Sequence, residues 1–99
     1  MFRHVVLLKW KESATADERR AVLEGIATLP GIIPEIRSYQ FGEDAGMTPQ
    51  GNSDLAIIAD FDTIADYVVY RDHPVHQDVI ARTMRPILES RAAVQHELD

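Results

Sequence analysis

Histidine and tyrosine residues gather around one short segment of the chain. Tyr70 precedes the run 73–76 (His-Pro-Val-His), and another histidine, His4, lies near the N-terminus. His73 and His76 are three positions apart, so they lie near one another on a first helical turn. Imidazole titrates near neutrality, as proton transfer at cellular pH requires. We therefore expect an acid–base pair in a pocket if the fold brings His4 to this helix start.

Each of these residues also has a purely structural interpretation, and the catalytic and structural interpretations both stay open. A His-Pro-x-His run is typical of a helix start in which His73 bonds to backbone and His76 is partly packed. His4 is equally well explained as a core histidine with its hydrogen bonds satisfied, and Tyr70 as an aromatic plug at a helix break. Three imidazoles can also bind zinc. Because no carboxylate stands beside them and an i, i+3 histidine pair is a weak metal signal, we expect no metal. No cofactor is expected either.

The composition limits the class of protein. A length of 99 residues is typical of one domain, so we expect a single domain over residues 1–99. The net charge of −6 disfavours nucleic acid and anionic lipid as partners. The chain has no cysteine, lacks an apolar run near the ~20 residues that a membrane span needs, and starts without a signal-peptide pattern. We expect a cytoplasmic protein.

Four segments have the composition or alternation of strands, namely 2–10, 35–42, 54–61 and 91–98. In the first, the even-numbered residues share one face and the odd-numbered residues the other. Both faces carry apolar residues, so both are expected to be covered. Residues 42–53 are rich in glycine and polar residues and form a long loop, passive or lid-like.

The first helix is predicted after Thr15, which starts a capping box with Glu18. Residues 30–31 (Pro-Gly) are expected to end it. Its apolar residues recur at helical spacing and predict a buried stripe of Val22, Ile26 and Leu29.

The second helical region is predicted to break in two. Asp62 or Thr63 caps a short helix that runs through Tyr70, with a buried stripe of Ile64, Tyr67 and Val68. Asp72 is expected to cap the next helix, which begins at the proline of 73–76 and stops before Pro86.

The order β-α-β-β-α-β predicts an α+β, ferredoxin-like subunit with helices on one face of an antiparallel sheet. The other face would expose an apolar patch to water: Val5, Leu7, Ala56 and Ile58. Two such sheets stacked face to face cover both patches, so we expect a homodimer.

Three motifs carry a resemblance over essentially the full chain. They are residues 3–11 (Arg-His-Val-Val-Leu-Leu-Lys-Trp-Lys), residues 30–34 (Pro-Gly-Ile-Ile-Pro), and Tyr70 followed by 73–76. Their order and spacing resemble the stress-responsive dimeric α/β-barrel (Dabb) family. The resemblance implies a ferredoxin-like subunit and a two-subunit barrel with sheets inside and helices outside.

The motifs are similar to those of the olivetolic acid cyclase type within that family. This similarity implies a cofactor-independent cyclase- or lyase-type enzyme in which His76 abstracts a proton next to a carbonyl. Tyr70 would hydrogen-bond the developing oxyanion, and His4 would complete the catalytic set. Arg37 and Tyr39 are expected to point into the same cavity and, with His73, to bind a small hydrophobic or carbonyl-containing ligand.

Two other functions are weighed against the enzyme. A non-enzymatic stress or ligand-binding dimer is consistent with a family that includes many members without known chemistry. A monooxygenase or haem-degrading function is supported only by the fact that such proteins share this fold. A cavity with convergent polar groups would favour an enzyme, and one filled by side chains would favour a passive dimer.

Overall fold

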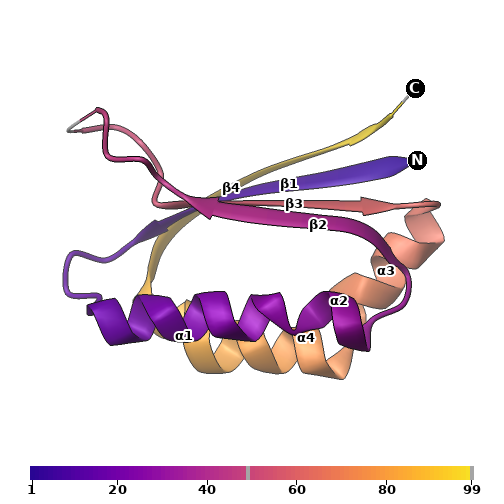
Figure 1. The fold of residues 1–99 in the computed structure, drawn as a ribbon, viewed down its shortest axis with the longest axis horizontal. Coiled ribbons are helices and arrows are strands. Elements are labelled where there is room, and N and C mark those ends of the chain that lie inside the picture. The colour runs from indigo at the N-terminus through magenta and orange to yellow at the C-terminus, as the bar shows by residue number, and fades with distance from the viewer. Residues whose placement is uncertain (49, 99) are drawn as a thin grey trace.

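The computed structural model describes residues 1–48 and 50–98. A four-stranded sheet forms one layer and the helices form a second layer beneath it, with the two termini near each other at one end (Figure 1). The main elements in chain order are β1 (Phe2–Trp10), α1 (Ala16–Ala27), α2 (Leu29–Ile32), β2 (Ile36–Glu43), β3 (Leu55–Phe61), α3 (Ile64–Asp72), α4 (Pro74–Val79) and β4 (Leu88–Glu97). This is the predicted ferredoxin-like order, with the second helical region broken as expected.

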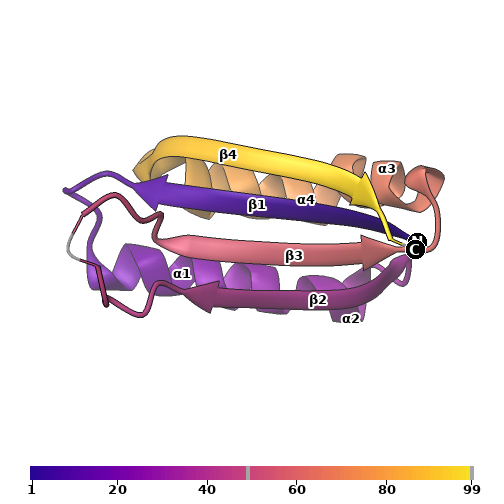
Figure 2. The same ribbon diagram turned by 90° about the horizontal axis from the view of Figure 1, so that it is seen from above.

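The strands lie in the order β2-β3-β1-β4, and every neighbouring pair is antiparallel (Figure 2). The central strand β1 places His4 opposite Ala59 of β3 and opposite Gln95 of β4. Directly opposed residues of antiparallel strands point to the same side of the sheet. Gln95 and His4 therefore share a face although they are far apart in the sequence.

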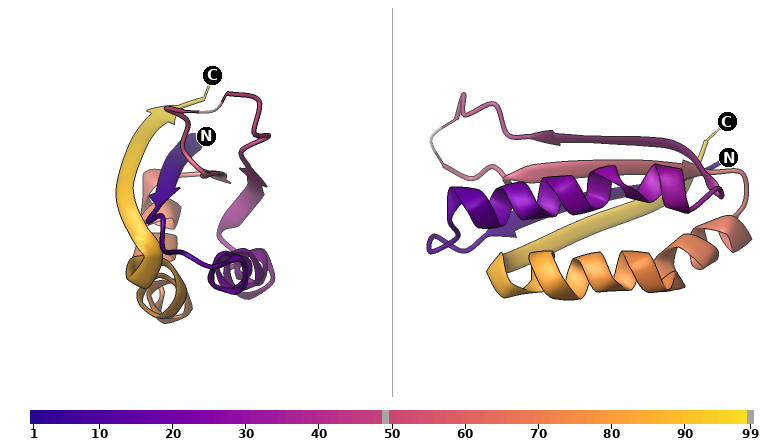
Figure 3. Two further views of the ribbon diagram at one scale, coloured as in Figure 1. Left: turned by 90° about the vertical axis from the view of Figure 1, so that its left-hand side faces the viewer. Right: turned by 60° about the horizontal axis from the view of Figure 1, so that its bottom comes forward.

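The helices cover the even-numbered face of β1, as predicted. All helices lie on one side of the curved sheet, with α1 and α4 running side by side (Figure 3). The five even-numbered side chains of β1 are at most 8% exposed: Phe2, His4, Val6, Leu8 and Trp10. The main core lies between this face and the helices.

Helix α1 begins as predicted. The Thr15 side chain accepts from the Glu18 amide, and the Glu18 carboxylate accepts from the Thr15 amide. The expected stripe is buried at Val22, Ile26 and Leu29. The prediction that residues 30–31 end the helical path is wrong, because they lie inside the short helix α2. A proline fits an early helical position, where its missing N–H costs no hydrogen bond.

Helix α3 starts at the expected Thr63 cap, which accepts from the Asp66 amide. Its buried stripe differs from the prediction: Ile64 is 54% exposed, whereas Tyr67 and Tyr70 are buried. The helix is rotated so that its two tyrosines, spaced three apart, face the sheet. This rotation brings Tyr70 into the core beneath β3.

The cap of α4 and the end of the second helical region also differ from prediction. His73, not Asp72, caps α4, because its Nδ1 accepts from the Val75 amide. The helical path does not stop before Pro86: a π turn over Ile80–Met84 leads into a 3₁₀ turn over Arg85–Ile87. β4 then starts at residue 88, where it pairs with the end of β1 beyond a register shift.

The other face of the sheet is open and largely apolar. Leu7 is 41% and Val94 57% exposed, and the patch is continued by partly exposed Val5, Ala56 and Ile58. At one end of this face Arg3 forms a two-pronged ion pair with Asp60, at 2.8 and 2.9 Å. No helix of the described residues is long and apolar enough to cross a membrane.

Candidate active site

A cavity of about 200 Å³ lies between the sheet and the helices. Four of the six predicted site residues line it: His4 from β1, Tyr39 from β2, Tyr70 from α3 and His76 from α4. The broken second helical region is what makes this possible, because it turns the end of α3 and the start of α4 toward the same space. Aliphatic side chains form much of the remaining wall: Val6, Leu8, Ile26, Ile57, Val79 and Ile80.

The His76 imidazole is held in a defined orientation. Its Nδ1 lies 3.1 Å from the Arg71 carbonyl oxygen, which can only accept, so Nδ1 carries the proton. The lone pair is therefore on Nε2. Burial lowers the pKa of His76, and the hydrogen bond that Nδ1 donates to the Arg71 carbonyl opposes that effect in part. His76 is thus a neutral base at neutral pH.

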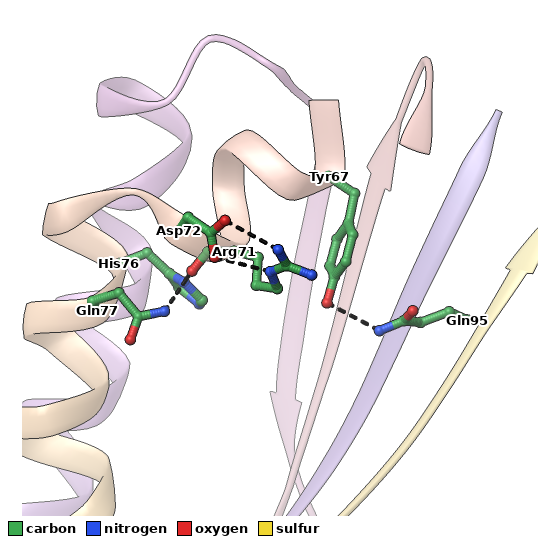
Figure 4. A network of polar contacts seen from close by, with 6 residues as sticks. All are labelled: Tyr67, Arg71, Asp72, His76, Gln77 and Gln95. Carbon is green, nitrogen blue, oxygen red and sulfur yellow. Dashed lines mark hydrogen bonds and ion pairs between the residues drawn. The ribbon is translucent and has the colours of Figure 1, made fainter. Parts of the chain in front are cut away.

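The Arg71 carbonyl is an anchor for two side chains. Its oxygen accepts one hydrogen bond from the His76 ring and one from the side-chain amide of Gln77, and both donors lie on α4 (Figure 4). The Arg71 guanidinium itself pairs with the adjacent Asp72 carboxylate at 2.9 and 3.0 Å. The break between α3 and α4 leaves this carbonyl free of a helical partner, which makes it available to both side chains.

Tyr70 supplies a hydroxyl to the same cavity. Its ring is 4% exposed, and its hydroxyl lies 3.3 Å from that of Tyr39. Burial raises the pKa of both phenols, so both stay protonated at neutral pH. Each hydroxyl has one hydrogen: one of the two lies between the oxygens of Tyr39 and Tyr70, and the other is free to be donated to a third group. The tyrosine pair can therefore donate a hydrogen bond to a ligand oxygen.

His4 has the opposite arrangement of its ring nitrogens. The Gln95 amide nitrogen donates to the Tyr67 hydroxyl at 3.0 Å and lies 3.0 Å from His4 Nδ1 (Figure 4 shows the Gln95–Tyr67 contact). His4 Nδ1 therefore accepts, and its proton is on Nε2. Burial, followed by the positive charge of Arg91, lowers the pKa of His4 to about 4. The cavity thus holds one imidazole that is a base and one that is a donor.

The two remaining predicted residues lie elsewhere. The placement of Arg37 in the cavity is wrong: its Nε forms an exposed ion pair with Asp62 at 3.4 Å. The register of β2 shifts between Ile36 and Ser38, and this irregularity breaks the alternation that would have put Arg37 beside Tyr39. His73 caps α4 and does not line the cavity, which fits its structural interpretation.

Sequence reasoning missed Gln95, Tyr67 and Arg91, which either line the cavity or orient its histidine. The alternation of the last strand does put Arg91 and Gln95 on one face. Only the register against β1 shows that this face is the helix-covered one, because Arg91 pairs with buried Leu8.

A larger hollow of about 520 Å³ lies on the open face of the sheet, between Leu7, Ala56 and the described part of the 42–53 loop. It holds none of the tyrosines or histidines, so we assign the chemistry to the smaller cavity. The described residues of the loop line this hollow and not the smaller cavity. Among the described residues, no three metal-binding side chains come together as a metal site.

The layered β-α-β-β-α-β fold, with a mostly apolar cavity between sheet and helices and an open apolar sheet face, defines a ferredoxin-like subunit of the α/β-barrel type. Residues 2–97 match the Stress responsive A/B Barrel Domain (Dabb) family. The chain belongs to this family, as the resemblance of its motifs predicted.

Relatives of the chain agree with this assignment. A stress-response A/B barrel domain-containing protein of Arabidopsis thaliana is 32% identical over 83 residues, covering 81% of this chain and 71% of that protein. A dimeric ferredoxin-like protein of unknown function from Thermobifida fusca is 38% identical, with a TM-score of 0.89 over 98% of this chain and 90% of that one. The hydroxynitrile lyase of Passiflora edulis shares the fold at 19% identity, with a TM-score of 0.83 over 99% and 93% of the two chains.

Proposed function

We propose that this protein is a homodimeric, cofactor-independent acid–base enzyme that acts on a small carbonyl compound as a cyclase or lyase. The observation that carries the proposal is the neutral His76 imidazole, whose Nδ1 is bound to the Arg71 carbonyl and whose ring lies against Tyr70. Its Nε2 has no hydrogen-bond partner among residues 1–48 and 50–98. A base and a hydrogen-bond donor in one mostly apolar cavity are what proton transfer next to a carbonyl requires.

In the cyclase direction, His76 Nε2 removes a proton from the carbon next to a ligand carbonyl. The C–H electron pair becomes the enolate double bond, and the carbonyl π pair moves onto oxygen, where a tyrosine hydroxyl donates a hydrogen bond. The enolate carbon then forms a bond to a second carbonyl carbon of the ligand. The resulting alkoxide takes the proton back from the imidazolium, so the step needs no redox partner.

The same groups support a lyase reaction on an α-hydroxynitrile, the substrate type named for the Passiflora edulis enzyme. His76 Nε2 takes the hydroxyl proton, the O–H pair forms the carbonyl, and the carbon–carbon bond breaks with its electrons on cyanide. The imidazolium then protonates cyanide to HCN. His4 Nε2–H and the tyrosine pair are available to bind the oxygen.

The test follows two reactions. Cleavage of mandelonitrile is followed by benzaldehyde absorbance, and deuterium uptake from D₂O is followed for phenylpyruvate and acetophenone. His76→Ala is expected to reduce the active reaction about 100-fold or more, and Tyr70→Phe about 10-fold or more. His96→Gln removes an exposed imidazole outside the cavity and is expected to leave the rate unchanged. If the rates of all three variants equal that of the unmodified protein, the enzyme proposal is abandoned.

One observation favours a second candidate, a non-enzymatic ligand-binding dimer. No buried side-chain nitrogen or oxygen in the described residues lacks a hydrogen-bond partner, so the cavity is stable without a reacting ligand. Binding of a ligand to the cavity without any turnover that depends on His76 would favour this candidate.

The homodimer is supported by the open sheet face and by relatives described as dimeric ferredoxin-like proteins. Val94→Glu places a charge in that face and is expected to convert a dimer of twice the 11.2 kDa chain mass into monomer in sedimentation velocity. Ile64→Glu is the matched control, because Ile64 is equally exposed but lies on α3. A monomeric unmodified protein at micromolar concentration contradicts the dimer.

A further inference from the structure

We infer that the ligand of the cavity carries a carboxylate group, which Arg91 binds at the mouth. The inference rests on the proposed function for the location of the site and adds the chemical class of the ligand. Arg91 takes the role that the sequence suggested for Arg37, whose guanidinium is engaged elsewhere.

Arg91 is directed to the cavity by the sheet register. It lies opposite Leu8, which is fully buried against the helices, so both side chains are on the helix-covered side. Arg91 is itself solvent-exposed while lining the cavity, which places its charge where the cavity opens to water.

The charge of Arg91 is not neutralised within the described chain. Two arginines line the cavity, and Arg71 is already paired with Asp72 at 2.9 Å. Within residues 1–48 and 50–98, no carboxylate lies within ion-pair distance of Arg91, whereas five of the eight arginines pair with an aspartate. Arg19 and Arg85 also lack such a partner there, but neither lines the cavity. The described lining also contains no aspartate or glutamate. In a chain of net charge −6, this opening is therefore locally positive.

A single guanidinium with neutral surroundings suits a monoanionic carboxylate, because its planar fork matches the two carboxylate oxygens. The apolar walls then accept a short hydrocarbon part, and the base and donors at His76 and Tyr70 meet a carbonyl group of the same molecule. A small oxo acid satisfies all three requirements.

The experiment compares acids with their uncharged amides. Binding of 3-phenylpropanoate and 3-phenylpropanamide, and of phenylacetate and phenylacetamide, is measured by calorimetry at pH 7 and low salt. The unmodified 99-residue chain is expected to bind each acid about tenfold tighter than its amide. Arg91→Gln is expected to remove this preference, and Arg91→Lys to retain part of it.

The matched control is Arg82→Gln, which also removes one positive charge but from an exposed arginine that pairs with Asp78 outside the cavity. It should keep the tenfold preference. The inference is overturned if acid and amide behave alike with the unmodified protein, including the case in which neither binds, or if Arg91→Gln keeps the preference.

The result is separable from the proposed enzyme. His76→Ala leaves Arg91 in place, so this variant should still prefer acids while losing turnover. An acid preference together with unchanged turnover in His76→Ala would retain the carboxylate site and reject the acid–base role. A second readout is the His4 imidazole, whose pKa should rise in Arg91→Gln because the repelling charge is gone.

Discussion

The His76 imidazole lies over the Tyr70 ring, with the ring centroids 4.1 Å apart and the planes at 34°. Together with the bond to the Arg71 carbonyl, this contact restricts rotation of the imidazole. Tyr70 is in turn held by ring contacts to Phe61 and Tyr67 at 5.2 and 6.4 Å. The base is therefore supported by the core of the subunit, which is the condition for precise proton transfer.

The first prediction concerns the pH dependence of turnover. Burial lowers the pKa of His76, so its base form persists below the ordinary histidine value of 6.5. The rate should therefore be constant near neutrality and fall only as the pH drops below 6.5. We expect an acid limb in kcat/KM with an apparent pKa under 6.5, unchanged in His96→Gln. An acid limb with an apparent pKa above 6.5 would contradict the assignment of His76 as a buried neutral base.

The second prediction concerns stability and His4. Its pKa is about 4 in the folded chain and near 6.5 when unfolded, so the unfolded state binds more protons between these values. This contribution to stability is present above pH 6.5 and is lost as the pH falls toward 4. The His4 contribution to the free energy of unfolding should fall by about 2 kcal/mol between pH 7 and pH 5. In urea unfolding, His4→Gln should reduce the acid loss by about this amount, whereas His96→Gln should not.

The third prediction concerns the packing of α1 on α4. A Cβ added at Gly25 would lie 2.9 Å from Cγ1 of Val79, a buried and stiff side chain that also lines the cavity. Gly25→Ala should therefore destabilise the protein by about 1 kcal/mol or more, despite the better helix propensity of alanine. Gly31→Ala, with nothing within 4 Å, should be neutral or stabilising by up to about 1 kcal/mol. Equal effects in chemical unfolding would show that the close approach is unimportant.

The fourth prediction concerns the ion pair on the open face. The Arg3 guanidinium lowers the pKa of the Asp60 carboxyl, whose side chain is 8% exposed. Arg3→Gln leaves this carboxylate without its partner and should lower the urea midpoint more than Asp60→Asn does. The double variant should be less destabilised than the sum of the two single variants. Additive effects would mean that the pair contributes no coupling.

The parts of the fold that depend on local chemistry were predictable from the sequence. The strand alternation of residues 2–10, the capping box at Thr15 and the proline at the start of α4 each follow from short-range rules. The positions of the candidate residues His4, Tyr39, Tyr70 and His76 at one cavity were predictable because their elements had the correct order and the covered face was identified correctly.

The remaining parts depend on register and rotation, which no local pattern determines. The register shift beside Arg37 keeps that residue out of the cavity, and the pairing of β4 with β1 brings Arg91 to the cavity and Gln95 to His4. The rotation of α3 exchanged Ile64 for Tyr70 in the core, because two tyrosines fill the space beneath the sheet. His73 replaced Asp72 as the cap because Asp72 is still the last residue of α3 and His73 is the extended residue directly before Pro74.

Two neutral imidazoles face one cavity with opposite tautomers, His76 as base and His4 as donor. Long-range ¹H–¹⁵N correlation of the histidine side chains at pH 7 tests it without any substrate. We predict that His76 carries its proton on Nδ1 and that His4 carries its proton on Nε2. A proton on Nε2 of His76, or a charged imidazole at either position at this pH, would contradict the account.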